Sequence, residues 1–245
     1  MDNIVFIKER MEMGITHPFI CQTENNEWYI VKTLNMMPIS QLLAEVIGSK
    51  LVAEIGLPCP PVKFIYIPLQ ATLYVKPDWK DDLLIGPAFG SNYISYAKVA
   101  KTAQAKNTVY LSEQEQKWLY MFDRWILNSD RTASLIGTGN INLLFDEEQK
   151  KILVIDHNLA FDENADFSEH IFAPPNRTWR LDWVDKQTFT EKAIDILRNF
   201  DDIYKSIPDD WFARDEQFQE IETQINRIRS ILNRITEDCY WDNIE

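Results

Sequence analysis

Apolar and polar positions in the first third of the chain follow a strand pattern that one long helix interrupts. Two β-rich runs flank the polar segment 23–27, which predicts a hairpin. Across 39–55 the apolar residues recur at helical spacing and Gly56 follows them, so we expect a helix that ends there. The strands expected in this part of the chain are 15–22, 28–33, 62–67 and 71–75.

The remainder of the chain has mainly helical spacing. Two short apolar runs, 141–145 and 151–155, enclose a polar turn and predict a second hairpin. Ser112 and Glu115 have the spacing of a capping box, which predicts the start of a helix that continues to about residue 127. The other helices expected here are 91–106, 188–199, 201–206 and 214–238.

Both patterns break at Pro77 and the charged run 78–82. We expect this break to separate a β-rich part, residues 1–77, from a helical part, residues 78–245. The sequence therefore predicts an α+β fold with two lobes. The small lobe is an antiparallel sheet with one helix, and the larger lobe is mainly helical with a short hairpin.

The last expected helix carries a single apolar stripe. Its members alternate between spacings of three and four residues, as the a and d positions of a coiled coil do. The stripe covers about two and a half heptads, which is short for a coiled coil. Two interpretations stay open: the stripe packs on its own domain, or it forms the seam of a dimer. The stripe consists of Phe218, Ile221, Ile225, Ile228, Leu232 and Ile235.

Composition excludes several classes of function. The net charge is −13, which disfavours nucleic acid as a main partner because phosphate contacts need a basic surface. No apolar run reaches the length of a membrane span, and residues 1–10 lack the apolar core of a secretory signal. The three cysteines are far apart and form no CxxC pair, which is typical of a reducing compartment. We therefore expect a cytoplasmic protein with no membrane or nucleic-acid partner.

Lys32 is the first candidate for a functional side chain. It ends the apolar run 28–32, so its ammonium group must either reach water or meet an anion. Glu45 lies thirteen residues later on the expected helix. A strand lysine paired with a helix glutamate is the arrangement by which kinases orient a lysine onto nucleotide phosphates. A solvated lysine at a strand end is the simpler alternative.

A second group of polar residues follows apolar segments in the helical part. Asp156 comes directly after a buried run, where an unpaired carboxylate is costly, so we expect a divalent cation beside it. Asn142 precedes the facing strand, which brings its amide oxygen near Asp156. Asp130 lies in a polar turn, free to meet a substrate hydroxyl. The order Asp, Asn, Asp is found in phosphoryl-transfer enzymes, although each residue alone is also an ordinary turn or strand-end residue.

Taken in order, these segments resemble the HipA-like kinase family, and more narrowly its short, stand-alone members. The resemblance covers 13–157, because the C-terminal part matches only in being helical. It implies a bilobal protein-kinase-like fold distantly related to phosphatidylinositol 3- and 4-kinases. The segments that carry it are 13–18, Lys32, the Glu45 helix with 55–60, 128–131, 142–144 and 155–157.

For the nucleotide, the resemblance implies that ATP is bound with Mg²⁺. Lys32, oriented by Glu45, would contact the ATP phosphates. Gly14 lies in the segment 13–18, which would form the loop that covers them. The segment near 75–78 would be the hinge beside adenine.

For catalysis, the resemblance implies that Asp130 is the base or orients the acceptor hydroxyl, and that Asn142 and Asp156 hold Mg²⁺. Asp130 and Asn142 are twelve residues apart, farther than is usual in the family, because an insertion separates them. Asn140 is therefore an alternative to Asn142.

A further alternative places the Asp-Asn pair earlier in the chain. Asp123 and Asn128 have the family's usual spacing, but they fall inside a strongly apolar helical pattern.

The activity implied is an ATP- and Mg²⁺-dependent kinase that phosphorylates a Ser or Thr hydroxyl on a protein. By family membership alone, this extends to the toxin of a toxin–antitoxin pair, with an antitoxin or other regulatory partner. Two alternatives remain. One is a catalytically inactive relative that binds a nucleotide or a partner protein, which the insertion after Asp130 favours. The other is a small-molecule or lipid kinase, and the lack of a basic membrane-facing cluster counts against a lipid.

Overall fold

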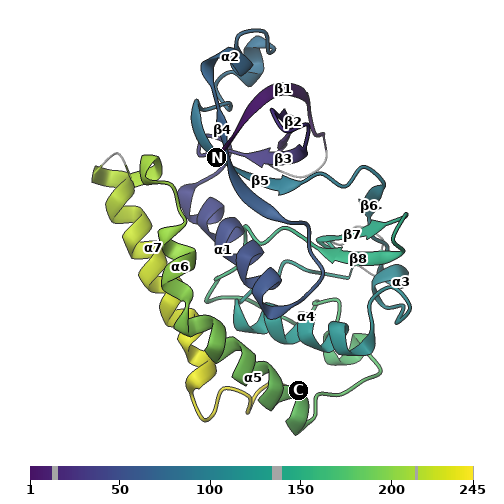
Figure 1. The fold of residues 1–245 in the computed structure, drawn as a ribbon. Coiled ribbons are helices and arrows are strands. Elements are labelled where there is room, and N and C mark those ends of the chain that lie inside the picture. Colours follow the sequence, from purple (N-terminus) through teal and green to yellow (C-terminus); the bar gives the residue numbers. More distant parts are fainter. Residues whose placement is uncertain (13–15, 134–139, 213–214, 245) are drawn as a thin grey trace.

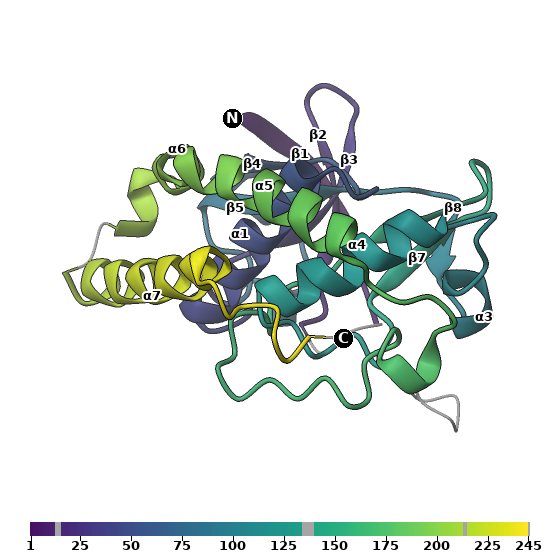
Figure 2. The same cartoon turned by 90° about the horizontal axis from the view of Figure 1, so that it is seen from below.

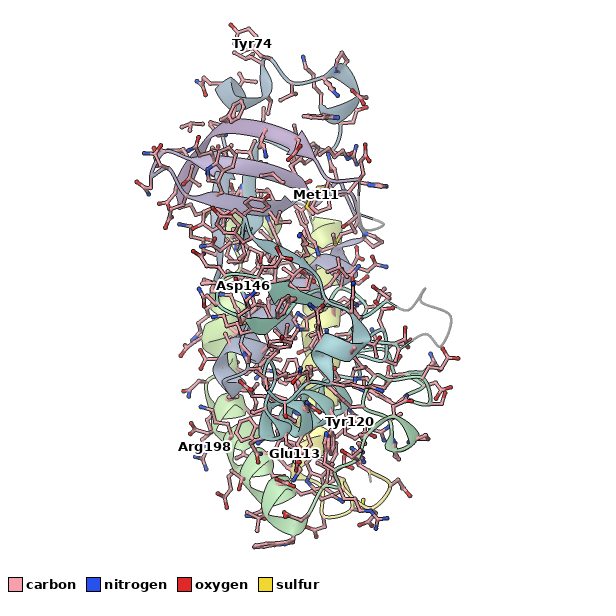
Figure 3. All side chains as sticks on the ribbon, turned by 90° about the vertical axis from the view of Figure 1, so that its right-hand side faces the viewer. Met11, Tyr74, Glu113, Tyr120, Asp146 and Arg198 are labelled. Atoms are coloured by element: carbon pink, nitrogen blue, oxygen red, sulfur yellow. The ribbon has the colours of Figure 1, made fainter. Side chains whose placement is uncertain are left out.

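Most of the β-structure lies at one end of the molecule and most of the helices at the other (Figure 1). This computed structural model describes residues 1–12, 16–133, 140–212 and 215–244. In the side view of Figure 3, Tyr74 marks the tip of the β end, whereas Glu113 and Arg198 lie towards the helical end. The α+β class expected from the sequence is confirmed.

Five strands close into a barrel in the order β1-β2-β3-β5-β4. Neighbouring strands are antiparallel except β1 and β4, whose parallel pairing closes the ring. The expected antiparallel sheet is therefore corrected to a barrel, which leaves no open sheet edge. The strands are β1 (Asp2–Arg10), β2 (Phe19–Thr23), β3 (Trp28–Lys32), β4 (Val62–Ile67) and β5 (Gly86–Asn92).

Three sequence-based expectations in this region fail. The sequence analysis does not predict β1, because the three charges at 8–10 obscure its apolar pattern. Residues 71–75 are not a strand, since one helical turn, α2 (Leu69–Thr72), begins after Pro68. Residues 91–106 are not one helix, because β-branched and aromatic residues within 93–99 favour extended chain. The end of β5, then β6 (Ala97–Val99) and α3 (Thr102–Ala105), occupy that segment.

The chain leaves the barrel after Asn92, at the end of β5. The hinge expected near 75–78 is wrong, because Val75 packs against the barrel core and β5 follows it in the same barrel. The division of the chain at residues 77 and 78 stays a prediction, and β5 lies beyond it.

The hairpin predicted in the helical part is confirmed. It consists of β7 (Leu143–Asp146) and β8 (Lys151–Val154), which pair antiparallel. β6 adds a third strand on the outer side of β7. The hairpin places the residues just before β7 and just after β8 next to each other, which matters for the candidate site.

The helices of this part begin with α4 (Glu113–Trp125), whose predicted capping box is confirmed by the bond from the Glu115 backbone N–H to Ser112 Oγ. None of the helices in the described ranges is both long and apolar enough to cross a membrane. The remaining helices are α5 (Trp183–Arg198), α6 (Phe200–Lys205) and α7 (Asp215–Asn233). Short 3-10 turns lie at η1 (Pro77–Trp79), η2 (Pro174–Asn176), η3 (Asp209–Phe212) and η4 (Arg234–Thr236).

Helix α1 (Ile39–Ile55), which has the predicted bounds, is the centre of the larger core. It contacts α5, α6 and α7, and Figure 2 shows α7 alongside it. Its buried residues lie on all sides of the helix, as expected for a helix enclosed by other elements. Among them are the polar residues Glu45 and Ser49, which the candidate site uses.

The apolar stripe of α7 packs within the chain. Ile221, Ile225, Ile228 and Leu232 are buried in the same core as α1, so they are not available as a dimer seam. Phe218 alone of the stripe is half-exposed. The oligomeric state of the protein stays a prediction.

One tryptophan joins the helical part to the barrel. Trp211, in η3, is fully buried and donates its indole N–H to the carbonyl oxygen of Pro87 in β5, at 3.1 Å. Its ring meets the edge of Phe64 in β4, with ring centroids 5.3 Å apart. The segment after α6 therefore packs on the barrel directly, in addition to the covalent connections that leave the barrel earlier in the chain.

His157, the residue after Asp156, packs closely against Gly48 of α1 and so fixes the distance between α1 and the end of β8. A Cβ on Gly48 would lie 2.4 Å from the Cβ of His157, so no larger residue fits without displacing backbone. His157 is buried, and its ring Nε2 has no hydrogen-bond partner in the described part of the chain. Burial, with a smaller effect of the nearby Arg131 charge, lowers the pKa of His157 to about 3.

This burial makes stability depend on pH. Below the ordinary pKa of about 6.5, the unfolded chain binds a proton that neutral His157 in the folded chain does not, so acid favours unfolding. We expect the free energy of unfolding to fall by about 2 kcal/mol between about pH 7 and about pH 5 through this residue. Urea unfolding of wild type and of His157→Phe at the two pH values measures it. Equal pH dependence in both proteins would contradict the assignment. His170 is also buried with a lowered pKa. Because it is present in both proteins, its contribution to the pH dependence cancels in the comparison.

Candidate active site

Lys32 lies at the end of β3 and bridges two carboxylates from distant parts of the chain. Its Nζ is 3.0 Å from Glu45 Oε1 on α1 and 3.2 Å from Asp156 Oδ1 just after β8. The other oxygen of Glu45 accepts the backbone N–H of His157 at 2.7 Å. One cluster therefore joins the barrel, α1 and the β7–β8 hairpin.

The charges of this cluster support one another. Burial alone would lower the pKa of Lys32, but the carboxylates of Glu45 and Asp156 outweigh it and hold the pKa above its ordinary value. Lys32 is therefore cationic at neutral pH. The side chain of Asp156 remains 34% exposed, whereas that of Glu45 is 5% exposed, so Asp156 is the partner open to a ligand.

Asp130 faces this cluster from the loop after α4. Its Oδ2 accepts an N–H from the side-chain amide of Asn142 at 2.8 Å and another from Asn140 at 2.6 Å. With Oδ2 occupied twice, Oδ1 is the oxygen without a hydrogen bond to any described residue. Burial raises the pKa of Asp130 and the charge of Asp156 adds to this, while the two amides oppose it. A raised pKa makes a carboxylate a better proton acceptor.

Unusual backbone conformations place Asn142 and Asp156. Their φ angles are 47° and 59°, in the left-handed region that Asn and Asp tolerate better than most residues. The carbonyl oxygen of Asn142 accepts the backbone N–H of Ile155 at 3.3 Å, so the two residues flank one hairpin base. The guanidinium of Arg131 donates to the carbonyl oxygens of Ile141, Asn142 and Ile155. The arginine thus fixes the backbone on both sides of the hairpin.

A fully buried polar network anchors Arg131. Its Nε lies 2.8 Å from Asp123 Oδ2, which also accepts the Nε2–H of His170 at 3.0 Å. His170 carries that proton on Nε2 because its Nδ1 accepts the backbone N–H of Phe172. Burial by itself would raise the pKa of Asp123, but Arg131 and His170 reverse the effect, so its pKa is lowered.

This network was not predicted from the sequence, and it overturns one alternative. Asp123 and Asn128 are hydrogen-bonded to each other at 3.1 Å and both are fully buried. Both side chains are closed to solvent and cannot meet a nucleotide, so the earlier Asp-Asn pair is a structural element. Its only sequence signal is a polar residue inside an apolar helix face, which indicates burial with a partner.

The side-chain oxygens at this site are suitable ligands for a small divalent cation. Asn142 uses its amide nitrogen for Asp130, which leaves its Oδ1 without a hydrogen bond to the described residues. Asp156 accepts a hydrogen bond from Lys32 at Oδ1, and its Oδ2 has no partner among the residues that the structure describes. Carboxylate and amide oxygens are the ligands Mg²⁺ prefers. No group of three or more His, Cys, Asp or Glu side chains in the described ranges could form an alternative metal centre.

A pocket of about 410 Å³ opens beside Asp130. The N-terminal part of α1, the loop residues 129–132, residues 158–162 and α7 all contribute to its wall. Arg227 of α7 shapes it: one N–H group donates to the carbonyl oxygen of Phe161 at 2.7 Å, and Nε lies 3.1 Å from Glu163. Phe161 has φ 64°, so this contact holds a strained turn in place.

The structure brings together five of the six predicted site residues in two adjoining clusters. Lys32, Glu45 and Asp156 form one, and Asp130 with Asn142 forms the other. Asn140 also donates to Asp130, as Asn142 does. The structure therefore does not decide which of the two amides is the metal ligand. Gly14 and its two neighbours, residues 13 and 15, lie outside the described residues, so its predicted role is not tested. The functional roles of all these residues stay predictions.

Comparison with solved structures shows a kinase fold. The chain is similar to the Helicobacter pylori proinflammatory kinase CtkA, with a TM-score of 0.53, 13% sequence identity and 97% of each chain covered. A Golgi casein kinase matches with a TM-score of 0.42 and 12% identity, over 100% of this chain and 76% of that chain. No curated protein matches the sequence significantly.

Comparison with protein families gives a more specific result. The family model described as HipA-like kinase matches residues 4–244. The match includes the barrel, the β7–β8 hairpin and the C-terminal helices, and thus extends beyond the segments that carry the sequence resemblance. Because nearly the entire chain is matched, this protein belongs to the HipA-like kinase family.

Proposed function

We propose that the protein transfers the γ-phosphoryl group of ATP to a Ser or Thr hydroxyl of another protein, with Mg²⁺ as the metal. The observation that carries the proposal is Lys32, which bridges Glu45 and the partly exposed Asp156 beside Asp130. Kinases use such a lysine to hold nucleotide phosphates and such an aspartate to hold the metal. Family membership supports phosphoryl transfer, and the protein acceptor is the finer part of the proposal.

In the proposed reaction each side chain has one task. Lys32 turns from Asp156 towards the phosphates while Glu45 keeps it oriented. Asp156 and Oδ1 of Asn142 would hold Mg²⁺, which supplies charge neutralisation when bound. The acceptor oxygen bonds to the γ-phosphorus as the bond from that phosphorus to the ADP oxygen breaks. Oδ1 of Asp130 accepts the hydroxyl proton, since Oδ2 is held by two amides.

We assign the acceptor to the pocket beside Asp130, because it is the cavity that adjoins the proposed base. Its volume of about 410 Å³ has room for a side chain that presents a hydroxyl. A role as toxin, with an antitoxin as partner, belongs to the same proposal and rests on the family alone.

Nucleotide binding is tested first. Mg–ATP at 100 times its Kd should stabilise the fold by about 2.7 kcal/mol, a rise in melting temperature of roughly 5–10 °C for a chain of this size. Lys32→Met should lose most of the rise, as should wild type with EDTA. Lys63→Met is the matched control, because Lys63 also bridges two carboxylates, Asp2 and Glu27, on the barrel surface. A wild-type melting curve that ignores Mg–ATP would remove the kinase proposal.

Catalysis is separable from binding at the two aspartates. Asp130→Ala should keep the Mg–ATP melting shift and slow phosphate transfer by about 10²–10⁴-fold, because the base acts in the transition state. Asp156→Ala should lose both, because it holds the metal. Radiolabelled ATP with a degenerate Ser/Thr peptide mixture measures transfer, and Asp166→Ala, an exposed carboxylate on a surface turn, is the control. Intact binding without transfer in wild type would instead support the inactive, ligand-binding alternative.

The acceptor pocket predicts a separate effect of Arg227. Arg227→Gln should release the turn at Phe161 and raise the KM for the peptide acceptor about tenfold, an effect on the order of 1.4 kcal/mol, while the KM for ATP stays unchanged. Arg229→Gln on the same helix is the control, because Arg229 pairs with Asp201 away from the pocket. If both KM values rise together, Arg227 supports the whole site and not the acceptor pocket.

A further inference from the structure

A second cavity of about 260 Å³ lies where the end of α4 meets the C-terminal segment of the chain. Its lining includes Arg124 of α4, Arg234 of η4, Glu237 and Tyr240. None of these residues belongs to the candidate active site or its acceptor pocket. The combination of two arginines in one cavity is notable in a protein with a net charge of −13.

Neither arginine has a carboxylate partner in the described part of the chain. The guanidinium of Arg124 lies over the ring of Phe167, 4.4 Å from its centroid. Arg234 donates Nε to the carbonyl oxygen of Ile231 at 2.8 Å and Nη2 to that of Trp125 at 3.1 Å. Its Nη1 is left without an acceptor among the described residues. Glu237, on the exposed side of the lining, forms no salt bridge with either arginine.

The hydroxyl of Tyr240 is a second feature, besides the two arginines, that indicates a binding site. Its oxygen is buried and has no hydrogen-bond partner in the described ranges. Buried polar atoms without a partner are rare in native proteins and usually mark a site for water or an ion. Tyr240 lines the cavity together with Arg124 and Arg234. Burial raises the pKa of Tyr240, and the charges of the two arginines oppose the rise. The Arg234 guanidinium is 5.9 Å from the tyrosine ring centroid.

We propose that this cavity binds a phosphate group, held by the guanidinium groups of Arg124 and Arg234 and by the hydroxyl of Tyr240. Arg124 can offer paired N–H donors to two phosphate oxygens, Arg234 can add its remaining Nη1 donor, and the tyrosine supplies an O–H donor. The volume accommodates an anion of that size. The phosphate comes either from a phosphorylated side chain or from free phosphate, and both present the same oxygens. This site is independent of the proposed kinase reaction.

Replacing Tyr240 tests the proposal because the variant should behave differently in chloride and in phosphate. In chloride buffer, Tyr240→Phe should leave the melting temperature unchanged or raise it, because the hydroxyl has no bond to lose. In phosphate buffer of equal ionic strength, the same variant should lose part of the stabilisation that wild type gains. Arg124→Gln should lose most of it, and Arg198→Gln, an exposed arginine near the helical end of the molecule (Figure 3), should lose none.

The measurement is a thermal unfolding series in inorganic phosphate, with titration calorimetry to give Kd. We expect wild type to gain several degrees at a phosphate concentration 100 times Kd, and Tyr240→Phe to raise Kd about tenfold. Tighter binding of phosphoserine than of inorganic phosphate would identify a phosphorylated side chain as the source, and equal binding would identify free phosphate. The proposal is overturned if phosphate and chloride give equal melting temperatures. It is also overturned if both variants keep the full phosphate effect, or if acetate stabilises equally well.

Discussion

The buried ion pair between Asp123 and Arg131 is the constraint on which the candidate site depends. Two charges without access to solvent are tolerated only with near-complete hydrogen bonding, and removing one partner of such a pair costs several kcal/mol. Arg131 meets this demand by donating to three carbonyl groups at the base of the β7–β8 hairpin. The requirements of a buried guanidinium therefore set the backbone that carries Asn142 and Asp156.

Lys32 extends this constraint to the barrel. The lysine is kept charged by Glu45 and Asp156, so the strand, the central helix and the hairpin must meet for any one of them to be electrostatically satisfied. A ligand with its own negative charge can replace Asp156 as a partner of Lys32 without leaving the ammonium unpaired.

The sequence predicted those elements whose signal is local. The bounds of α1 and β4 follow from apolar spacing with Gly and Pro at the ends, and α4 from its capping box. The barrel closure was missed because a parallel pairing between residues far apart in the chain has no periodic signal, and β1 was missed because the charges at 8–10 obscure its apolar pattern. Lys32, Glu45, Asp130, Asn142 and Asp156 were predicted as site residues from residue type and order, and their roles stay predictions. The network of Asp123, Arg131 and His170 depends on contacts across 47 residues. A polar residue inside an apolar helix face indicates a buried partner, but the sequence does not say which residue that partner is.

Trp211 has a mechanical consequence. The barrel is joined covalently to the rest of the chain on both sides of α1 and after β5, and Trp211 adds a non-covalent attachment at Pro87. A body attached at several separated points keeps few rotational degrees of freedom. Relative rotation of barrel and helices must therefore either pivot about the tryptophan or carry η3 along with it. Since η3 contacts α7, which lines the pocket beside Asp130, any displacement of η3 would act directly on one wall of that pocket.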